Sequence, residues 1–215
     1  MDDLNTIVEG IRESFTVKSD ARDRALQRSR GLIRLFAQAI RATHRQEWDD
    51  AAAKIAEARD QAHTLVADLK PFPDLYYTGY TQDALKEYVE ANLTYAFVRG
   101  EPLPTPESLN VEPSTYLGGL TEAATELRRR ILDIIRHQHS DEAERLLEVM
   151  DAIYTELTTV DFPDAITHGL RRRTDVLRGV LERTRGDLTN SLRQQELQQA
   201  LRDLESRLNS SGEQT

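Results

Sequence analysis

The chain has 215 residues, a formal net charge of −9, 39% hydrophobic and 30% charged residues, and no cysteine. This length suits a single domain with a core of its own. The acidic balance excludes a simple basic nucleic-acid binder but leaves room for a local basic patch. The lack of cysteine excludes disulfides and thiolate metal sites, and it indicates a reducing compartment.

The chain shows no targeting or membrane signal. Its first residues are acidic and lack the apolar core of a signal peptide. No run of residues approaches the ~18 apolar positions that a membrane-spanning helix needs. We therefore expect a soluble, cytoplasmic protein that does not associate with membranes.

Apolar residues recur at three- and four-residue steps along nearly the whole chain, which is the period of an amphipathic helix. The first such stretch has a polar middle, 18–23, without proline or glycine, so it forms either one long helix or two helices joined near Ser19 and Asp20. Prolines 71 and 73 end the second helix, since proline removes a backbone donor. The predicted long helices cover 4–44, 46–70, 81–99, 114–136, 141–159 and 164–208.

No stretch alternates with period two over enough residues to indicate a strand. The predicted fold class is therefore all-α, with six or seven long helices in a single domain over 1–208 and a flexible tail over 209–215. Apolar positions near the C-terminal end, such as Leu197, Leu201 and Leu208, have few partners within the chain. This pattern favours oligomerisation through helix faces.

Four glutamates are spaced to share faces of two predicted helices. Glu87 and Glu90 are three residues apart, and Glu122 and Glu126 are four apart; both spacings bring Cβ atoms to roughly 5–6 Å of each other. Carboxylates suit Mg²⁺ or Mn²⁺, and such an ion can activate water for attack on a phosphodiester. Glutamate is also a strong helix former that fills solvated faces. Spacing alone leaves a metal site and an ordinary surface as alternatives.

Other catalytic patterns are absent, including the glycine-rich nucleotide loops, the zinc-protease helix motif and the serine-hydrolase elbow. Two arginine runs remain, 128–130 and 171–173. Successive residues wrap around a helix, so no single face takes all three arginines of a run. Phosphate binding needs basic residues on a shared surface, and the alternative is that most of them are solvated or paired with nearby acids.

Four segments of the chain, in order and with similar separations, resemble the translin family, which comprises translin and translin-associated factor X. The segments are 72–77, 86–91, 116–129 and 170–173. Residues 86–91, KEYVEA, are similar to the "QEYVEA" segment of the factor X branch. Residues 116–129 resemble the family block Y-L-x-G-V that ends in E-L-x-R, and 170–173 resemble its L-R-K-R-Y segment.

The resemblance implies an all-α fold that assembles into a hollow octamer and binds single-stranded RNA and DNA. In the factor X branch it implies an Mg²⁺-dependent endoribonuclease whose acidic residues face the interior. Glu87 and Glu90 match the two glutamates of that branch's first active helix. Glu122 stands where the branch has a catalytic aspartate, which keeps the charge on a longer arm, and Glu126 matches the glutamate four residues later.

The resulting hypothesis is a homo-octameric endoribonuclease that cleaves single-stranded RNA with Mg²⁺, Mn²⁺ being a second option. The predicted catalytic residues are Glu87, Glu90, Glu122 and Glu126. The predicted metal ligands are Glu90, Glu122 and Glu126. The predicted nucleic-acid contacts are Arg128, Arg129 and Arg130. The alternatives are an oligomer that binds single-stranded RNA or DNA without cutting it, and a purely structural helical oligomer.

Overall fold

The computed structural model describes residues 2–137 and 140–212, and helices account for the regular structure in these ranges, with no strand. The helices are α1 (Asp2–His44), α2 (Trp48–Leu69), α3 (Pro73–Tyr76), α4 (Gly79–Arg99), α5 (Pro106–Leu109), α6 (Pro113–Ile135), α7 (Asp141–Thr159), α8 (Asp164–Thr167) and α9 (Leu170–Gly212). Six of them are long and three are single turns, so the all-α prediction is confirmed. None of the described helices is both long and apolar enough to cross a membrane.

The helix ends follow local chemistry. The stretch predicted as one or two helices is one continuous helix, α1, because nothing in its polar middle breaks the hydrogen-bond ladder. Helix α4 ends at Arg99, and the next residue, Gly100, has a φ of 69°, the left-handed conformation that glycine adopts readily. Helix α6 begins at Pro113, earlier than predicted, since the missing N–H of proline costs nothing at the first helical position.

The predicted continuous helix 164–208 is wrong at its start. It is divided into α8 and α9 by His168 and Gly169, whose φ angles are 48° and 83°. The Asp164 carboxylate accepts a hydrogen bond from the Gly169 N–H at 2.6 Å, which stabilises the break. Helix α9 then continues to Gly212, and residues 213–215 of the predicted tail lie outside the described residues.

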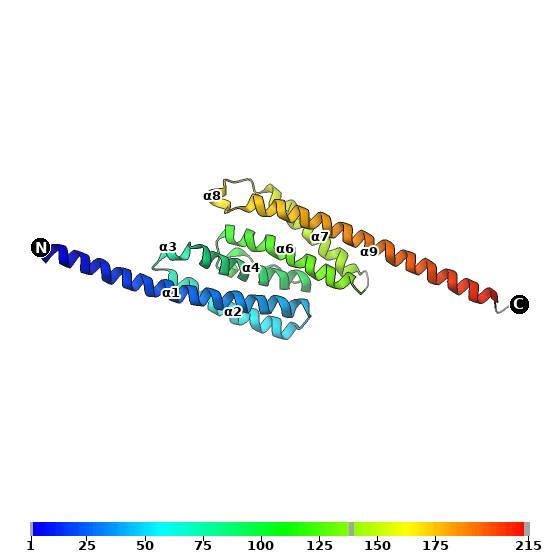
Figure 1. The fold of residues 1–215 in the computed structure, drawn as a ribbon, viewed down its shortest axis with the longest axis horizontal. Helices are drawn as coiled ribbons and strands as arrows, with labels where there is room; N and C mark the ends of the chain where they lie inside the picture. The colour runs from blue at the N-terminus through cyan, green and yellow to red at the C-terminus, as the bar shows by residue number, and fades with distance from the viewer. Residues whose placement is uncertain (1, 138–139, 213–215) are drawn as a thin grey trace. The chain divides into compact units, whose positions relative to one another are not determined.

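The chain divides into two compact units, Met1–Ala123 and Ala124–Thr215. The prediction of a single domain over 1–208 stays a prediction. In the first unit α1, α2 and α4 pack side by side (Figure 1). Tyr88 of α4 is fully buried, and its ring lies 5.4 Å from that of Phe36 of α1. Helix α4 is buried almost all round from Tyr88 to Thr94, which makes it the central helix of this unit.

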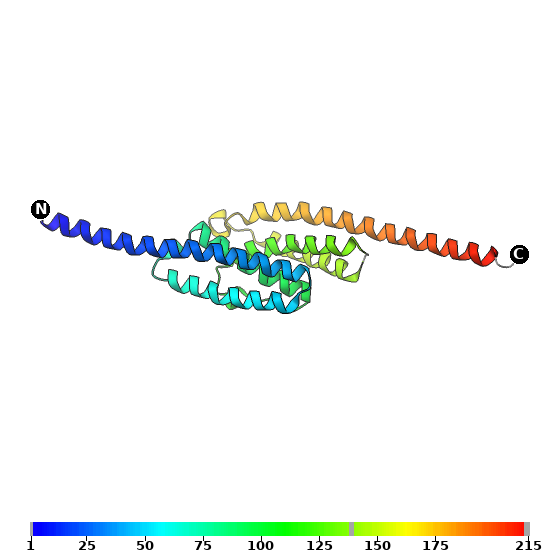
Figure 2. The same cartoon turned by 60° about the horizontal axis from the view of Figure 1, so that its bottom comes forward.

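The second unit is built on α7 and α9, which lie along each other (Figure 2). Leu146 and Met150 of α7 and Leu177 and Leu181 of α9 are among its buried residues. Apolar residues at three- and four-residue steps therefore form this core as the periodicity predicts.

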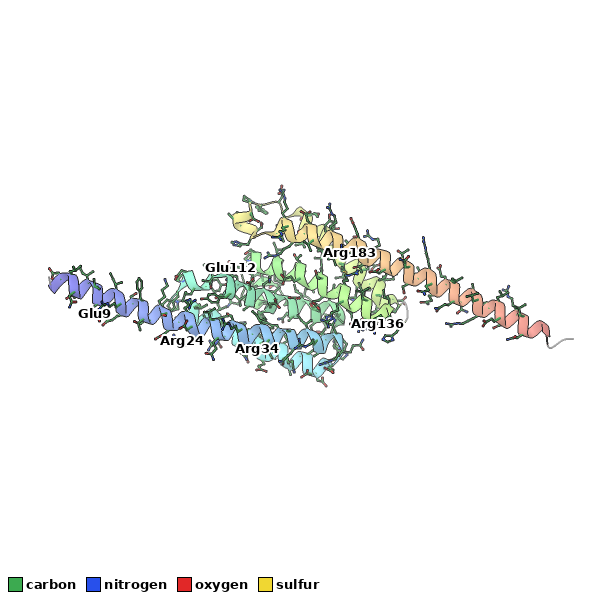
Figure 3. The ribbon with its side chains drawn as sticks, viewed as in Figure 1. Glu9, Arg24, Arg34, Glu112, Arg136 and Arg183 are labelled. Carbon is green, nitrogen blue, oxygen red and sulfur yellow. The ribbon has the colours of Figure 1, made fainter. Side chains whose placement is uncertain are left out.

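Each unit has one helix that extends past its neighbours. In the first unit the N-terminal part of α1 projects beyond α2 and α4, and residues 3–17 are exposed (Figures 1 and 2). Glu9 lies on this projecting part, whereas Arg24 and Arg34 lie further along α1 (Figure 3). In the second unit the last part of α9 projects in the same way beyond α7.

Candidate metal centre

Helix α4 and the first part of α6 approach closely at Gly119. A Cβ atom added at Gly119 would lie 2.6 Å from Val89 Cβ and 2.8 Å from the carbonyl oxygen of Lys86, distances that real Cβ atoms do not show. Only glycine fits here, because any side chain would push the two helices apart. Gly119 thereby brings Glu122, nearly one turn later on α6, against α4.

Two hydrogen bonds align the helices further. The Tyr77 hydroxyl, just before α4, donates to Glu112 at 3.3 Å, and Glu112 marks the start of α6 in Figure 3. The Thr115 hydroxyl donates to the Gln82 side chain at 2.6 Å. As residue numbers rise from Tyr77 towards Val89 in α4, the numbers of their contacts rise from Glu112 to Gly119 in α6. The two helices therefore run parallel here. We call this line of contacts, through residue 123, the α4–α6 contact.

The α4–α6 contact brings three of the predicted glutamates together. Carboxylate oxygens of Glu87, Glu90 and Glu122 all lie within 4.8 Å of one another, and we call these residues the glutamate cluster. Glu90 is 7% exposed, and the other two are half-buried. The ordinary-surface alternative therefore does not describe Glu90. Like charges at this separation repel each other, so the cluster is stable only with compensating positive charge or hydrogen bonds.

Lys86 supplies one such charge. Its Nζ donates to a Glu122 carboxylate oxygen at 2.7 Å and lies 3.8 Å from Asp83 Oδ1, while its side chain is 16% exposed. Burial by itself lowers the pKa of Lys86, but the hydrogen bond to Glu122 and the charges of Glu122, Asp83 and Glu87 raise that pKa above its ordinary value. The side chain is therefore a full ammonium ion at neutral pH.

The donor set fits a hard divalent cation. It consists of carboxylate oxygens alone, which Mg²⁺ and Mn²⁺ prefer. Lys86 bonds one of the three carboxylates, Glu122, and a divalent ion would add positive charge where oxygens of all three lie within 4.8 Å of one another. Glu126 belongs to the second unit, and its assignments as catalytic residue and metal ligand stay predictions.

The arginines 128–130 have separate environments in the second unit. Arg128 donates to the Thr184 hydroxyl at 2.9 Å and pairs with Asp187 at 2.9 Å. Arg130 is 8% exposed and makes a two-pronged pair with Glu142, at 2.9 and 3.1 Å.

Arg129 differs from its two neighbours, because its side chain is 56% exposed and lies 4.0 Å from Glu126. Two of the three predicted nucleic-acid contacts thus have strong partners within the protein. The role of all three in nucleic-acid binding stays a prediction.

Sequence reasoning missed the parts that Lys86 and Gly119 play, although both left a signal. Lys86 stands where the factor X segment "QEYVEA" has glutamine, and it lies four residues before Glu90. Gly119 is the second of two glycines inside a predicted helix, where glycine costs about 1 kcal/mol relative to alanine and so indicates a packing reason.

Comparison with known proteins finds clear relatives. No protein-family profile matches the chain. An uncharacterised protein of Methanocaldococcus jannaschii is 28% identical over 204 residues, which cover 94% of this chain and 88% of the relative.

Three solved structures share the fold. AfC3PO is 31% identical with a TM-score of 0.78, over 86% of this chain and 96% of that one. The structure of AfC3PO in complex with duplex RNA is 30% identical with a TM-score of 0.79, over 86% of this chain and 95% of that one. Apo-NeC3PO, at 21% identity and a TM-score of 0.78 over 86% and 96%, supports the fold alone.

Proposed function

Because this chain belongs to the family of translin and translin-associated factor X, we propose that it binds RNA and cleaves it with a divalent cation at the glutamate cluster. One observation carries the proposal. Two helices that are close only because residue 119 is glycine bring three carboxylates within 4.8 Å, one of them buried. Acids that merely kept a surface soluble would not need this arrangement.

The residues divide the work between the two helices. Glu90, the buried member, would hold the cation from α4, with Glu87 beside it, and Glu122 would hold it from α6. A bound Mg²⁺ or Mn²⁺ supplies Lewis-acid stabilisation of phosphodiester oxygens and a lowered pKa of water. Gly119 fixes the separation of the two helices, so the carboxylates are positioned before any ion binds.

Further members of the proposed site come from the family resemblance. It adds Glu126 as a ligand, and it places Arg129 beside the site, where this arginine would either contact the phosphate or pair with an acid such as Glu126, 4.0 Å away. The exposed side chain of Arg129 supports the phosphate contact. Arg128 and Arg130 would act mainly by holding their helices in place, because each already has an acidic partner.

The proposed substrate is single-stranded RNA, with single-stranded DNA as a further ligand. AfC3PO has been solved with duplex RNA, so a duplex of the same sequence belongs in every assay. Since phosphates would supply most of the contacts, binding should weaken as salt rises and show little preference for sequence.

We propose that the chain acts as a homo-oligomer, the octamer implied by the resemblance, in the cytoplasm. Both projecting helix ends support self-association, because each carries large apolar side chains at three- and four-residue steps that are exposed within this chain. These residues are Leu4, Ile7, Ile11 and Phe15 on α1 and Leu197, Leu201, Leu204 and Leu208 on α9.

The proposal is tested with end-labelled single-stranded RNA, incubated with the protein in Mg²⁺ or in EDTA. We expect fragments in Mg²⁺, none in EDTA, and none from Glu122→Ala. Asp133→Ala, which removes a half-buried acid further along the same helix, is the control and should cleave like the wild type. Cleavage that persists in EDTA or in Glu122→Ala would refute the proposed active site.

A second function is favoured by one observation. Lys86 already holds Glu122, which is what a protein that binds RNA without cutting it would tolerate. The same RNA measured by filter binding separates the two. Retention of RNA at low salt with no Mg²⁺-dependent fragments would establish the binding role.

A further inference from the structure

Lys86 bonds Glu122, one of the three carboxylates that a divalent cation would use. Resting on the metal site of the proposed function, we propose that Lys86 is a built-in counter-cation, which holds Glu122 while the cluster is metal-free and releases it when a divalent cation binds. Lys86 is thus a positioning residue. It affects both the affinity of the glutamate cluster for a divalent cation and the stability of the protein without that cation.

The first observation is the hydrogen bond between Lys86 and Glu122. The Lys86 ammonium bonds Glu122 at 2.7 Å, across from α4 to α6, so one of the three carboxylates already has a cationic partner. The Lys86 backbone is fixed at the Gly119 contact. A divalent ion that uses all three carboxylates must therefore compete with an ammonium held on a rigid part of the fold.

The second observation is the burial of the Lys86 side chain. Lysine is seldom buried without a partner. In the described part of the chain Lys86 is more covered than the other lysines in ion pairs: 16% of its side chain is exposed, against 24% for Lys54 and 43% for Lys18. A position this covered, beside three acids, gives the lysine a specific electrostatic task.

The third observation is that the residue at position 86 is lysine and not arginine. The chain has four lysines, at 18, 54, 70 and 86, and otherwise uses arginine for positive charge. An arginine would clamp a carboxylate with two parallel hydrogen bonds, whereas the lysine ammonium is a point charge on a flexible stem. Lysine is thus the residue that can neutralise Glu122 and still leave when a stronger cation arrives.

Charge balance gives the consequences. With Lys86 in place one carboxylate of the cluster, Glu122, has a positive charge bonded to it, which offsets part of the repulsion between the acids. Without Lys86 the carboxylates repel one another more strongly, so the metal-free protein loses stability. A divalent ion then no longer competes with this ammonium for Glu122, binds more tightly, and raises the melting temperature by a larger amount.

The test measures Mn²⁺ binding by calorimetry and electron paramagnetic resonance, and melting temperature with and without Mn²⁺, in the whole protein. We expect Lys86→Met to bind Mn²⁺ about tenfold more tightly than the wild type, the scale of one charged hydrogen bond. Lys86→Met should also melt lower without metal and gain more from Mn²⁺. Lys86→Gln, which keeps a polar side chain without the charge, should behave alike and replaces Lys86→Met if that variant does not fold.

Two controls separate this inference from the proposed function. Lys54→Met removes a surface lysine paired with Asp50 and should leave Mn²⁺ affinity unchanged. Glu90→Gln should weaken Mn²⁺ binding in both the wild type and the Lys86→Met background. Equal or weaker binding by Lys86→Met, with Glu90→Gln still harmful, would overturn the counter-cation role and leave the metal site standing. No Mn²⁺ binding by any of these proteins would overturn both.

Discussion

The glutamate cluster and the arginines 128–130 begin as similar signals in the sequence and end as opposite structures. Each begins with like charges a few residues apart in the chain, Glu87 and Glu90 in one case and the consecutive arginines in the other. The glutamates, drawn from two helices, have carboxylate oxygens within 4.8 Å of one another. The arginines are consecutive, yet Arg128 pairs with Asp187, Arg130 pairs with Glu142, and Arg129 is mostly exposed.

The difference shows what a functional cluster requires. Spacing of three residues keeps Glu87 and Glu90 on one side of α4, whereas consecutive residues point about 100° apart around a helix. Gly119 then allows the second helix close enough to add Glu122, and Lys86 offsets part of the repulsion. The arginines are not brought together in this way. Arg128 pairs with Asp187, and Arg130 pairs with Glu142. We therefore assign chemistry to the cluster and a mainly structural role to Arg128 and Arg130.

The largest expected effect is on cleavage. Glu90→Gln keeps the shape of the side chain but removes its charge, and we expect RNA cleavage in Mg²⁺ to fall by at least about 100-fold. Loss of a group that merely supports a metal ligand already costs 10–100-fold in known sites, and a ligand should cost more. Glu142→Gln, the same change opposite Arg130, should leave cleavage within about twofold. Similar losses in both variants would erase the distinction between the two regions.

The next effect is on stability and concerns the close approach of the helices. Gly119→Ala would place a Cβ against Val89 and the Lys86 carbonyl, and overpacking of this kind costs about 1–3 kcal/mol. Gly31→Ala makes the same change on α1, where no atom lies within 4 Å of the added Cβ, and should stabilise by up to about 1 kcal/mol. Urea unfolding measures both, and a Gly119→Ala protein as stable as the wild type would show that the contact is not tight.

A smaller difference is expected within the arginine run. Arg130→Met removes a buried partner of Glu142 and should cost about 1–2 kcal/mol, because Glu142 is a third exposed and water compensates part of the loss. Arg129→Met replaces an exposed side chain and should change the free energy of unfolding by no more than about 0.5 kcal/mol. Equal costs in urea unfolding would contradict the different roles that we assign to these neighbours.

The smallest effect is on RNA binding. Arg129→Met should weaken binding of single-stranded RNA a few-fold and lower the slope of log affinity against log salt by about 1, as the loss of one phosphate contact does. Filter binding at several salt concentrations measures both quantities. An unchanged slope would remove Arg129 from the proposed interface.

Much of the fold could be predicted from the sequence because helix period and helix breakers are local. Pro71 and Gly100 each follow a helix as predicted, and the six long helices are present. The break between α8 and α9 depends on positive φ angles at His168 and Gly169, and a single glycine inside a helical pattern does not by itself show that the helix stops there. Local patterns also cannot show how far a helix runs into a polar tail, and α9 extends to Gly212.

The candidate site was only partly predictable, for a physical reason. Spacing shows which glutamates share a helix face, but the burial of Glu90 and the arrival of Glu122 depend on packing between helices. That packing rests on Gly119, and a sequence records such a close approach only as a costly glycine. The bond from Lys86 to Glu122 likewise joins residues 36 positions apart, so the pattern of acids alone predicted a site without its counter-cation.

The central claim is that Glu87, Glu90 and Glu122 bind a divalent cation. The most direct test is anomalous diffraction from crystals of the whole protein soaked in Mn²⁺. We expect an anomalous peak bonded to carboxylate oxygens of all three residues, with the Lys86 ammonium moved away from Glu122. A structure with Mn²⁺ bound elsewhere, no peak at the cluster and the Lys86–Glu122 pair intact would contradict it.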